Sequence, residues 1–181
     1  MARLYTRSGD DGRTGLASGE RVAKSSARIE ALGSVDEANA AIGVARAHLK
    51  GEPEPAVPPL LLDPLLDQIQ HRLFDLGADL AGAGPQRRIG REQAAELERA
   101  IDTLDDQLPA LRAFVLPGGT PAGAALHLAR GVCRRAERAV AALDAPEPAA
   151  LVYLNRLSDL LFVAARYANR ERGDVLWRGL P

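Results

Sequence analysis

Three arginines recur every four residues in the C-terminal half of the chain, at Arg130, Arg134 and Arg138. Glu137 lies among them. At about 100° per residue, these four side chains share one face of a helix. Guanidinium groups form bidentate pairs with phosphate oxygens, so this face is suited to bind a polyphosphate. A solvated basic face without a ligand is the alternative.

The opposite face of the same segment is apolar, and we expect it to pack against the core. It carries Ala125, Leu128, Val132, Ala139 and Leu143. Arg135 lies near its edge, where it could form an ion pair or extend its head group into solvent. Cys133 lies toward the packed side and is interpreted as a small core hydrophobe.

A carboxylate stands among small residues in the first half of the chain. Asp36 shares a helix face with Gly33, Ala40 and Gly43. Small neighbours favour close helix packing with the carboxylate held inside, and a buried carboxylate needs a cation, for which Arg130 is a candidate. An exposed aspartate on ordinary surface is the alternative.

A third polar face lies near the C-terminus, where Asn155, Asp159, Phe162 and Arg166 fall on one side of a helix. An amide both donates and accepts, so Asn155 could recognise an adenine edge or a ribose hydroxyl. A surface asparagine without a ligand is the alternative.

The N-terminal segment is rich in glycine and carries cations. Glycines at positions 9, 12 and 15 let the backbone approach a ligand, and their N–H groups can bind an anion, with Arg7 and Lys24 supplying charge. The spacing matches neither the dinucleotide-binding fingerprint nor the P-loop. A terminal arm that binds nothing is the alternative.

Other catalytic arrangements are missing from the sequence. His48, His71 and His127 are scattered, and none follows a glutamate at the spacing of a di-iron bundle. There is no H-E-x-x-H, C-x-x-C or serine nucleophile elbow. We therefore expect no metal held by protein ligands.

The elements that must position these residues are helices. Helical periodicity predicts five of them, over about 25–50, 60–81, 91–108, 121–143 and 149–171, with Thr120 as the N-cap of the fourth. Proline- and glycine-rich breaks separate them, including a loop over 51–59. The predicted fold is all-α, a single domain over 1–181. It comprises a loop-rich arm (1–24) without strands and an antiparallel, ferritin-like up-down bundle (25–173).

Composition limits the functional class. The net charge of −1 argues against a nucleic-acid-binding protein. No apolar run is long enough to span a bilayer, and the N-terminus lacks the apolar stretch of a secretory signal. A single cysteine excludes an intramolecular disulfide and fits a reducing compartment, so we expect a cytoplasmic protein.

The order of these segments resembles that of a known family, the ATP:cob(I)alamin adenosyltransferases of the five-helix class linked to propanediol and methylmalonyl metabolism. The resemblance covers 5–12, 33–37, 74–80, 114–119, 133–138 (C-R-R-A-E-R) and 153–159 (with L-N-R-L-S-D). Arg7 and Ser8 replace the commoner lysine and threonine and keep their hydrogen-bonding character.

The resemblance implies an enzyme that transfers the 5′-deoxyadenosyl group of ATP to cob(I)alamin, as a homotrimer with active sites between subunits. The implied ATP site comprises Thr6, Arg7, Ser8, Gly9, Thr14, Lys24, Arg134, Arg135, Glu137, Arg138 and Asn155. Asp36 and Arg130 resemble an interface salt bridge, and Phe114 resembles the residue that crowds the lower face of the corrin. Mg²⁺ is expected to be held mainly by phosphates, and a reductase and a mutase are expected transient partners. A non-catalytic ATP or corrinoid sensor, or an adenosylcobalamin carrier, is the alternative function.

Overall fold

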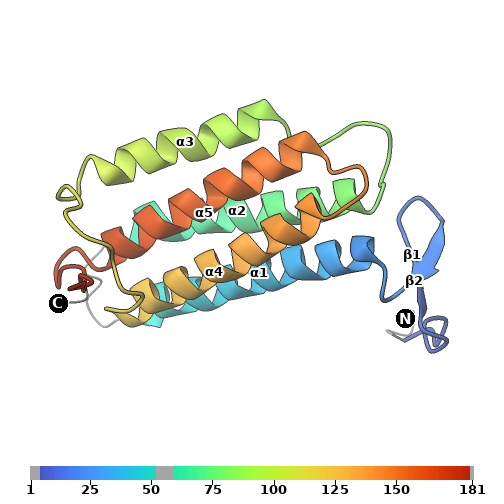
Figure 1. Cartoon of the computed structure of the whole chain (residues 1–181), viewed down its shortest axis with the longest axis horizontal. Coiled ribbons are helices and arrows are strands. Elements are labelled where there is room, and N and C mark those ends of the chain that lie inside the picture. Colours follow the sequence, from blue (N-terminus) through green and yellow to red (C-terminus); the bar gives the residue numbers. More distant parts are fainter. Residues whose placement is uncertain (1–4, 52–58, 180–181) are drawn as a thin grey trace.

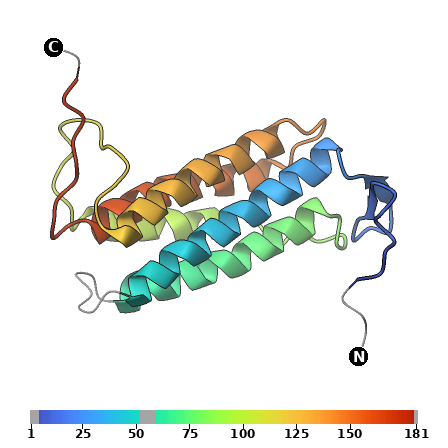
Figure 2. The same cartoon turned by 90° about the horizontal axis from the view of Figure 1, so that it is seen from below.

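The computed structural model describes residues 5–51 and 59–179, and five helices build this part of the chain (Figure 1). They are α1 (Ala27–Gly51), α2 (Pro59–Leu80), α3 (Arg91–Asp105), α4 (Pro121–Ala141) and α5 (Pro148–Ala168). Successive helices run in opposite directions (Figures 1 and 2). Helix α1 packs against α2 and α4, and α5 packs against α3 and α4. The predicted antiparallel five-helix architecture is confirmed.

Alanine stripes allow α1 and α4 to pack closely. A buried alanine recurs every seven residues on each helix, at Ala31, Ala38 and Ala45 and at Ala122, Ala129 and Ala136. Seven residues are close to two turns, so each stripe runs along one side of its helix. Small side chains at a helix contact let the two axes approach. This stripe on α1 is a different face from the one that carries Asp36.

Helix α5 is the central helix of the bundle. Its leucines at 154, 157, 160 and 161 are fully buried between the surrounding helices. By length and apolar composition alone it is the one described helix that would suffice for a membrane span, so the expectation that no apolar run is long enough is wrong on those two criteria. Because most of that stretch is buried inside the bundle, its apolar character is explained by the core.

Helix ends differ from the sequence prediction by a few residues. Helix α3 ends at Asp105 rather than near position 108, because Pro109 disfavours helical geometry before it. Helix α4 ends at Ala141 rather than near 143, and α5 at Ala168 rather than near 171, where Arg172 and Gly173 both donate to the carbonyl of Asn169 in a tight turn. Of the predicted loop over 51–59, residues 52–58 lie outside the described part.

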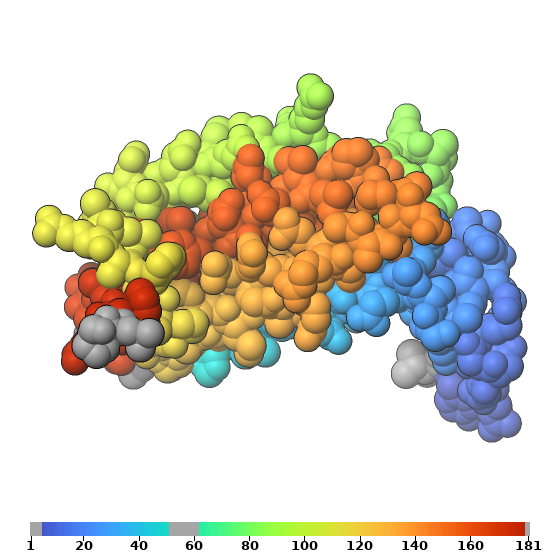
Figure 3. Space-filling model, in the orientation of Figure 1, coloured from blue at the N-terminus to red at the C-terminus, as the bar shows by residue number. Residues whose placement is uncertain are grey.

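The N-terminal arm contains a β-hairpin, so the prediction of an arm without strands is wrong. Strand β1 (Arg13–Gly15) pairs antiparallel with β2 (Arg21–Ala23). Each strand has three residues, too few to show the alternation by which a strand is recognised in a sequence. The hairpin projects from the end of the bundle where α1 begins (Figures 1 and 3). The N–H of Ser18 ties it to the carbonyl of Ala81 at 3.3 Å.

The segment between α3 and α4, residues 106–120, is called the connector below. Thr120 ends it as the predicted N-cap of α4, with its hydroxyl accepting from the N–H of Gly123 at 3.0 Å. Gly119 has a φ of +99°, and a Cβ there would overlap the side chain of Asn169. The connector therefore needs glycine at this position for both backbone and packing reasons.

Gly119→Ala is expected to lower the free energy of unfolding by about 3 kcal/mol, since left-handed backbone and overlap with Asn169 both oppose the methyl group. Urea unfolding followed by circular dichroism measures this. Gly77→Ala, at a helical position with open space, is the control and should be neutral or slightly stabilising. Equal stability of the two variants would contradict the packing argument.

Candidate active site

The outer side of α4 presents the predicted arginine cluster. Arg134, Arg135 and Arg138 are exposed along it. Nη1 of Arg138 donates to the carbonyl of Arg134 at 3.0 Å. Within the described residues, the guanidinium of Arg134 makes no hydrogen bond or ion pair. Exposed guanidinium groups on one side of a helix provide hydrogen-bond donors for a polyanion. Among the described residues, no carboxylate competes for the donors of Arg134.

Arg130 is positioned differently from the other arginines. It is half-buried, and its guanidinium lies over the ring of Phe162, 5.3 Å from the ring centroid. Cation–π contact with an α5 aromatic fixes its direction. Phe162 and Arg166 were predicted to share one polar face of α5. That face is not a continuous surface, because Arg166 is buried at the end of the bundle.

A hydrogen-bonded chain links α4, α5 and α3 beside the arginines. Nδ2 of Asn155 donates to Oε1 of Glu137 at 3.1 Å, and Nη1 of Arg156 donates to Oδ1 of Asn155 at 2.8 Å. Nε of Arg156 donates to Oε1 of Glu98 at 2.7 Å, and this bond raises the pKa of Arg156. Asn155 is thus held in one orientation by both neighbours.

Two members of this hydrogen-bonded network, Arg156 and Glu98, were not predicted. Arg156 follows Asn155 directly in the sequence, and that adjacency was the available signal. Glu98 lies on α3, and no spacing in the sequence links it to α5.

Asp36 is exposed, and the expectation of a buried carboxylate between helices is wrong. The contact with α4 uses the alanine stripe of α1, which turns the face with Gly33 and Asp36 outward. Glu37, not Asp36, forms the ion pair that joins α1 to α4, and its partner is Arg135. Within the described part of the chain, Asp36 and Arg130 form no ion pair.

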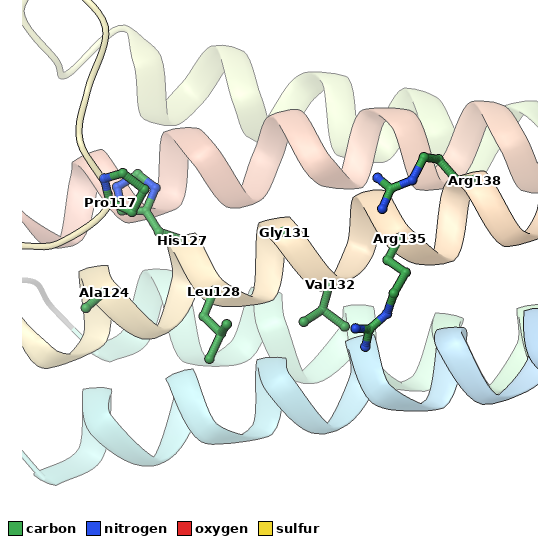
Figure 4. Close-up of a pocket in the computed structure, with 8 residues that line it drawn as sticks. All are labelled: Pro117, Ala124, His127, Leu128, Gly131, Val132, Arg135 and Arg138. Atoms are coloured by element: carbon green, nitrogen blue, oxygen red, sulfur yellow. The ribbon is translucent and has the colours of Figure 1, made fainter. Parts of the chain in front are cut away.

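An open groove of about 510 Å³ runs along α4, lined mainly by apolar groups (Figure 4). Figure 4 shows Leu128, Val132 and Arg135 projecting from one side of α4, with His127 on another side beside Pro117. Leu128 is 64% exposed, so the prediction that it packs in the core is wrong. The buried side of α4 passes through the neighbouring residue Ala129. Close packing of small alanine side chains makes the buried stripe of this helix narrow, so Leu128 lies outside it. Arg135 and Arg138 end the groove.

His127 lies against this groove but is buried. Burial and the nearby cation of Arg130 lower its pKa, so the imidazole is neutral near pH 7. Its ring packs at a tilt against Phe162, with 6.1 Å between ring centroids. This agrees with a packing histidine. Within the described residues, no group of three histidine, cysteine or acidic side chains could hold a metal ion.

Cys133, beside Arg134 in the sequence, faces the core as predicted. It is fully buried, and its thiol donates to the carbonyl of Leu154 at 3.4 Å. Burial, with a smaller contribution from Glu137, raises its pKa to about 12. The thiol is therefore protonated at neutral pH and unsuited to act as a nucleophile.

Cys133 is expected to resist alkylation by iodoacetamide at pH 8 in the folded protein, since only the thiolate reacts and the folded thiol ionises near pH 12. The unfolded thiol ionises near pH 9, so folding stability should fall as pH rises above that value. Mass spectrometry with and without guanidinium measures the labelling. Equally rapid labelling in both states would show that the burial is wrong.

The arm residues lie together at one end of the molecule. Oγ1 of Thr6 and Oγ of Ser8 are 2.8 Å apart, and Arg7 has a φ of +62°. Arg21 holds this turn by donating to the carbonyl of Ser8 at 2.7 Å. Lys24 lies beside Gly9, and Thr14 pairs with Val22 in the hairpin. Arg21 was not predicted, and it orders the segment that carries the other arm residues.

Phe114 belongs to the connector, which lies at the opposite end of the bundle from the arm (Figure 1). Its side chain is 78% exposed, and its ring meets that of Trp177 edge-on, 6.1 Å between centroids. One chain thus brings together Arg134, Arg135, Glu137, Arg138 and Asn155. It does not bring the arm or Phe114 to the same place.

Comparisons with known proteins agree on one family. The family model described as cobalamin adenosyltransferase matches residues 4–168. A corrinoid adenosyltransferase of Mycobacterium tuberculosis is 50% identical, over 98% of this chain and 94% of that protein. One of Bacillus subtilis is 44% identical, over 94% of this chain and 89% of that protein.

Solved structures agree with these relatives. A phenylalanine-to-histidine variant of the PduO-type ATP:corrinoid adenosyltransferase from Lactobacillus reuteri, complexed with cobalamin and ATP, superposes with a TM-score of 0.86. It is 36% identical and covers 97% of each chain. An arginine-to-lysine variant of that enzyme with ATP gives a TM-score of 0.82, at 37% identity over 97% of this chain and all of that one. This chain therefore belongs to the cobalamin adenosyltransferase family.

Proposed function

We propose that this protein transfers the 5′-deoxyadenosyl group of ATP to the cobalt of a reduced corrinoid and releases triphosphate. The observation that carries the proposal is the cluster on α4, where exposed Arg134 and Arg138 stand beside the fixed pair of Glu137 and Asn155. Such a site offers guanidinium groups for a triphosphate and an oriented amide for the nucleoside. Family membership over residues 4–168 supports it.

The reaction needs no nucleophile from the protein. The electron pair of Co(I) attacks C5′ of ATP, the bond between C5′ and oxygen breaks, and its electrons leave with triphosphate. Negative charge grows on the leaving oxygen, and the exposed Arg134 and Arg138 are proposed to stabilise it. Asn155 orients the nucleoside, so that C5′ faces the cobalt.

Mg²⁺ is proposed to enter this site bound to the nucleotide rather than to protein ligands. The described residues offer no carboxylate cluster around the arginines, and Glu137 already accepts from Asn155. Phosphate oxygens and water would therefore supply most ligands, as is usual for Mg²⁺ with nucleotides.

Phe114 is proposed to occupy the lower face of the corrin, where it keeps an axial ligand off the cobalt. Four-coordinate Co(II) is easier to reduce to Co(I), so an apolar ring there assists the electron transfer. The Lactobacillus reuteri variants change a phenylalanine in two structures and an arginine in a third. Those two positions are separated by as many residues as Phe114 and Arg134 are here, which supports both assignments.

The complete site is proposed to form between subunits of a homotrimer. Within each subunit, the arm and the bundle are proposed to act as one domain. The arm and the connector that carries Phe114 lie at opposite ends of the bundle, so a site with both is proposed to require a second copy (Figure 1). Exposed Asp36 is proposed to pair with Arg130 of a neighbouring copy, and exposed Leu128 to pack against it. Thr6, Arg7, Ser8, Gly9, Thr14 and Lys24 then join the ATP site.

Subunit mixing tests this arrangement. Lys24→Ala and Arg134→Ala should each be nearly inactive, but refolding them together should restore about a quarter of wild-type activity, because about one interface in four receives both intact halves. Activity is measured from cob(I)alamin and Mg-ATP. No recovery, in a mixture shown to contain hybrid oligomers, would place the arm and Arg134 in a site within one chain.

The main reaction is tested by anaerobic incubation with chemically reduced cob(I)alamin and Mg-ATP. Loss of the cob(I)alamin band with formation of adenosylcobalamin and one triphosphate is expected. ATP binding without turnover would instead support an ATP or corrinoid sensor, or an adenosylcobalamin carrier. A cytoplasmic reductase that supplies the electron and a mutase that accepts the product are the proposed transient partners.

A further inference from the structure

Two buried polar residues near the end of α5 hold the connector on either side of Phe114. Arg166 reaches the beginning of the connector, and Asn169 reaches its end. They stand three positions apart, so they leave α5 on nearly the same side. Neither residue belongs to the site described above.

Arg166 fixes the beginning of the connector. It is 3% exposed, so its guanidinium relies on protein acceptors. Nη2 donates to the carbonyl of Pro109 at 2.6 Å, and Nη1 lies 3.3 Å from Oδ1 of Asp105. Nε donates to Oδ2 of Asp174 at 2.8 Å. One planar group therefore joins the end of α3, the connector and the segment that follows α5.

Asn169 fixes the end of the connector. Its Nδ2 donates to the carbonyl of Gly118 at 2.9 Å, and its Oδ1 accepts from the N–H of Thr120 at 2.8 Å and from the hydroxyl of Thr120 at 3.0 Å. Gly119 and Gly123 leave space for this side chain that a Cβ would fill. The amide thus satisfies three groups at the point where the chain enters α4.

The segment after α5, residues 174–177, then runs beside the centre of the connector. The N–H of Trp177 donates to the carbonyl of Phe114 at 2.7 Å, and the N–H of Leu116 donates to the carbonyl of Val175 at 2.8 Å. Val115 and Leu176 form a β-bridge between these bonds. The backbone of Phe114 is therefore fixed by neighbours although its ring is mostly exposed.

We propose that Arg166 and Asn169 are positioning residues for Phe114, holding its ring at the height the corrinoid requires. This inference rests on the proposed function, in which Phe114 excludes an axial ligand from Co(II). An exposed ring on a loop can do so only if the loop is held to within about 0.5 Å, which needs supporting residues locked by packing and hydrogen bonds. We call the contacts of Arg166 and the contacts of Asn169 the two clamps. Loss of either clamp should thus impair the Co(II) step and leave the ATP site on α4 intact.

Asn169→Ala and Asp174→Asn test the two clamps separately. Asp174→Asn keeps the shape of its site, so it serves if Asn169→Ala fails to fold. With cob(II)alamin and Mg-ATP, electron paramagnetic resonance gives the ratio of four- to five-coordinate Co(II). We expect that ratio, and kcat from Co(II), to fall about tenfold to a hundredfold. The Kd of ATP by calorimetry should stay within about twofold, as should kcat from pre-reduced cob(I)alamin.

Arg46→Lys is the matched control. Arg46 is a half-buried arginine that also has several acceptors, Asp63 at 2.7 Å and Asp67 at 2.6 Å, but these join α1 to α2. Its replacement should cost stability without changing the Co(II) ratio. A similar fall in that ratio for Arg46→Lys would mean that general destabilisation, not positioning, produces the effect, and would overturn the inference.

The double variant with Phe114→Ala separates this inference from the proposed function. If the clamps act through Phe114, Asn169→Ala should lower kcat from Co(II) no further once the ring is gone. An independent, multiplicative loss would overturn the inference. If the clamp variants have the wild-type Co(II) ratio and kcat while Phe114→Ala is impaired, the inference is overturned and the proposed role of Phe114 stands. A Phe114→Ala enzyme with the wild-type Co(II) ratio would instead overturn the proposed role of Phe114, and the inference with it.

Discussion

Arg134→Ala is expected to lower kcat/KM for ATP by about a hundredfold to a thousandfold, as the loss of one oriented donor to a developing anion does elsewhere. The guanidinium of Arg134 is exposed on α4 and has no partner among the described residues, so its donors are available to a ligand. Folding should be unaffected, because among the described residues this side chain makes no hydrogen bond or ion pair that would be lost. Initial rates with saturating cob(I)alamin and varied Mg-ATP measure the effect.

Two further variants make this result specific. Arg134→Lys keeps the charge but not the forked donors, so an intermediate loss is expected if bidentate phosphate contact matters. Arg99→Ala removes an exposed arginine from α3, on another helix, and should behave as wild type. Unchanged turnover in Arg134→Ala would remove this residue from the site, and equal losses in Arg99→Ala would point to overall charge rather than a contact.

The helices could be predicted because the signals that define them are local. Thr120 followed by Pro121 marks the start of α4, and Pro109 and Gly173 mark where α3 and α5 have ended. The arginine spacing on α4 and the position of Asn155 also follow from helical geometry alone. Each of these inferences needs only neighbouring residues, and each agrees with the fold.

The errors arose where the outcome depends on a distant part of the chain. Leu128 and Asp36 are exposed because the alanine stripes, not these faces, meet between α1 and α4. Arg166 contacts Asp105 and Pro109, which are about sixty positions away, so helical periodicity could not reveal its role. The hairpin at 13–23 was missed because three-residue strands carry no periodic signal.

An exposed apolar face on one chain is also informative about the site. Leu128 on α4 is more than half exposed and lines the groove that Arg135 and Arg138 end, and Val44 on α1 is also more than half exposed. Large apolar groups grouped on one surface usually mark an interface. This agrees with the proposal that a second copy completes the site, since the arm and the connector of one chain lie at opposite ends of the bundle.

Phe114→Ala is expected to reduce the rate of adenosylation from cob(II)alamin by about a hundredfold while leaving the Kd of ATP unchanged. Among the described residues, Trp177 is the one aromatic neighbour of the exposed ring, so most of its apolar surface is available to a corrin. Burying a phenylalanine contributes about 2–3 kcal/mol, and this is the stabilisation that four-coordinate Co(II) would lose. That free energy corresponds to about a hundredfold in rate.

The comparison of two starting oxidation states decides whether the ring acts as proposed. From pre-reduced cob(I)alamin, Phe114→Ala should keep a rate within about threefold of wild type, because the attack on C5′ depends on ATP and not on the lower axial face. Phe114→Leu should recover part of the Co(II) activity, since it restores apolar bulk without the ring. An equal loss from both oxidation states would mean that Phe114 contributes to binding the corrinoid, and that the reduction step is controlled elsewhere.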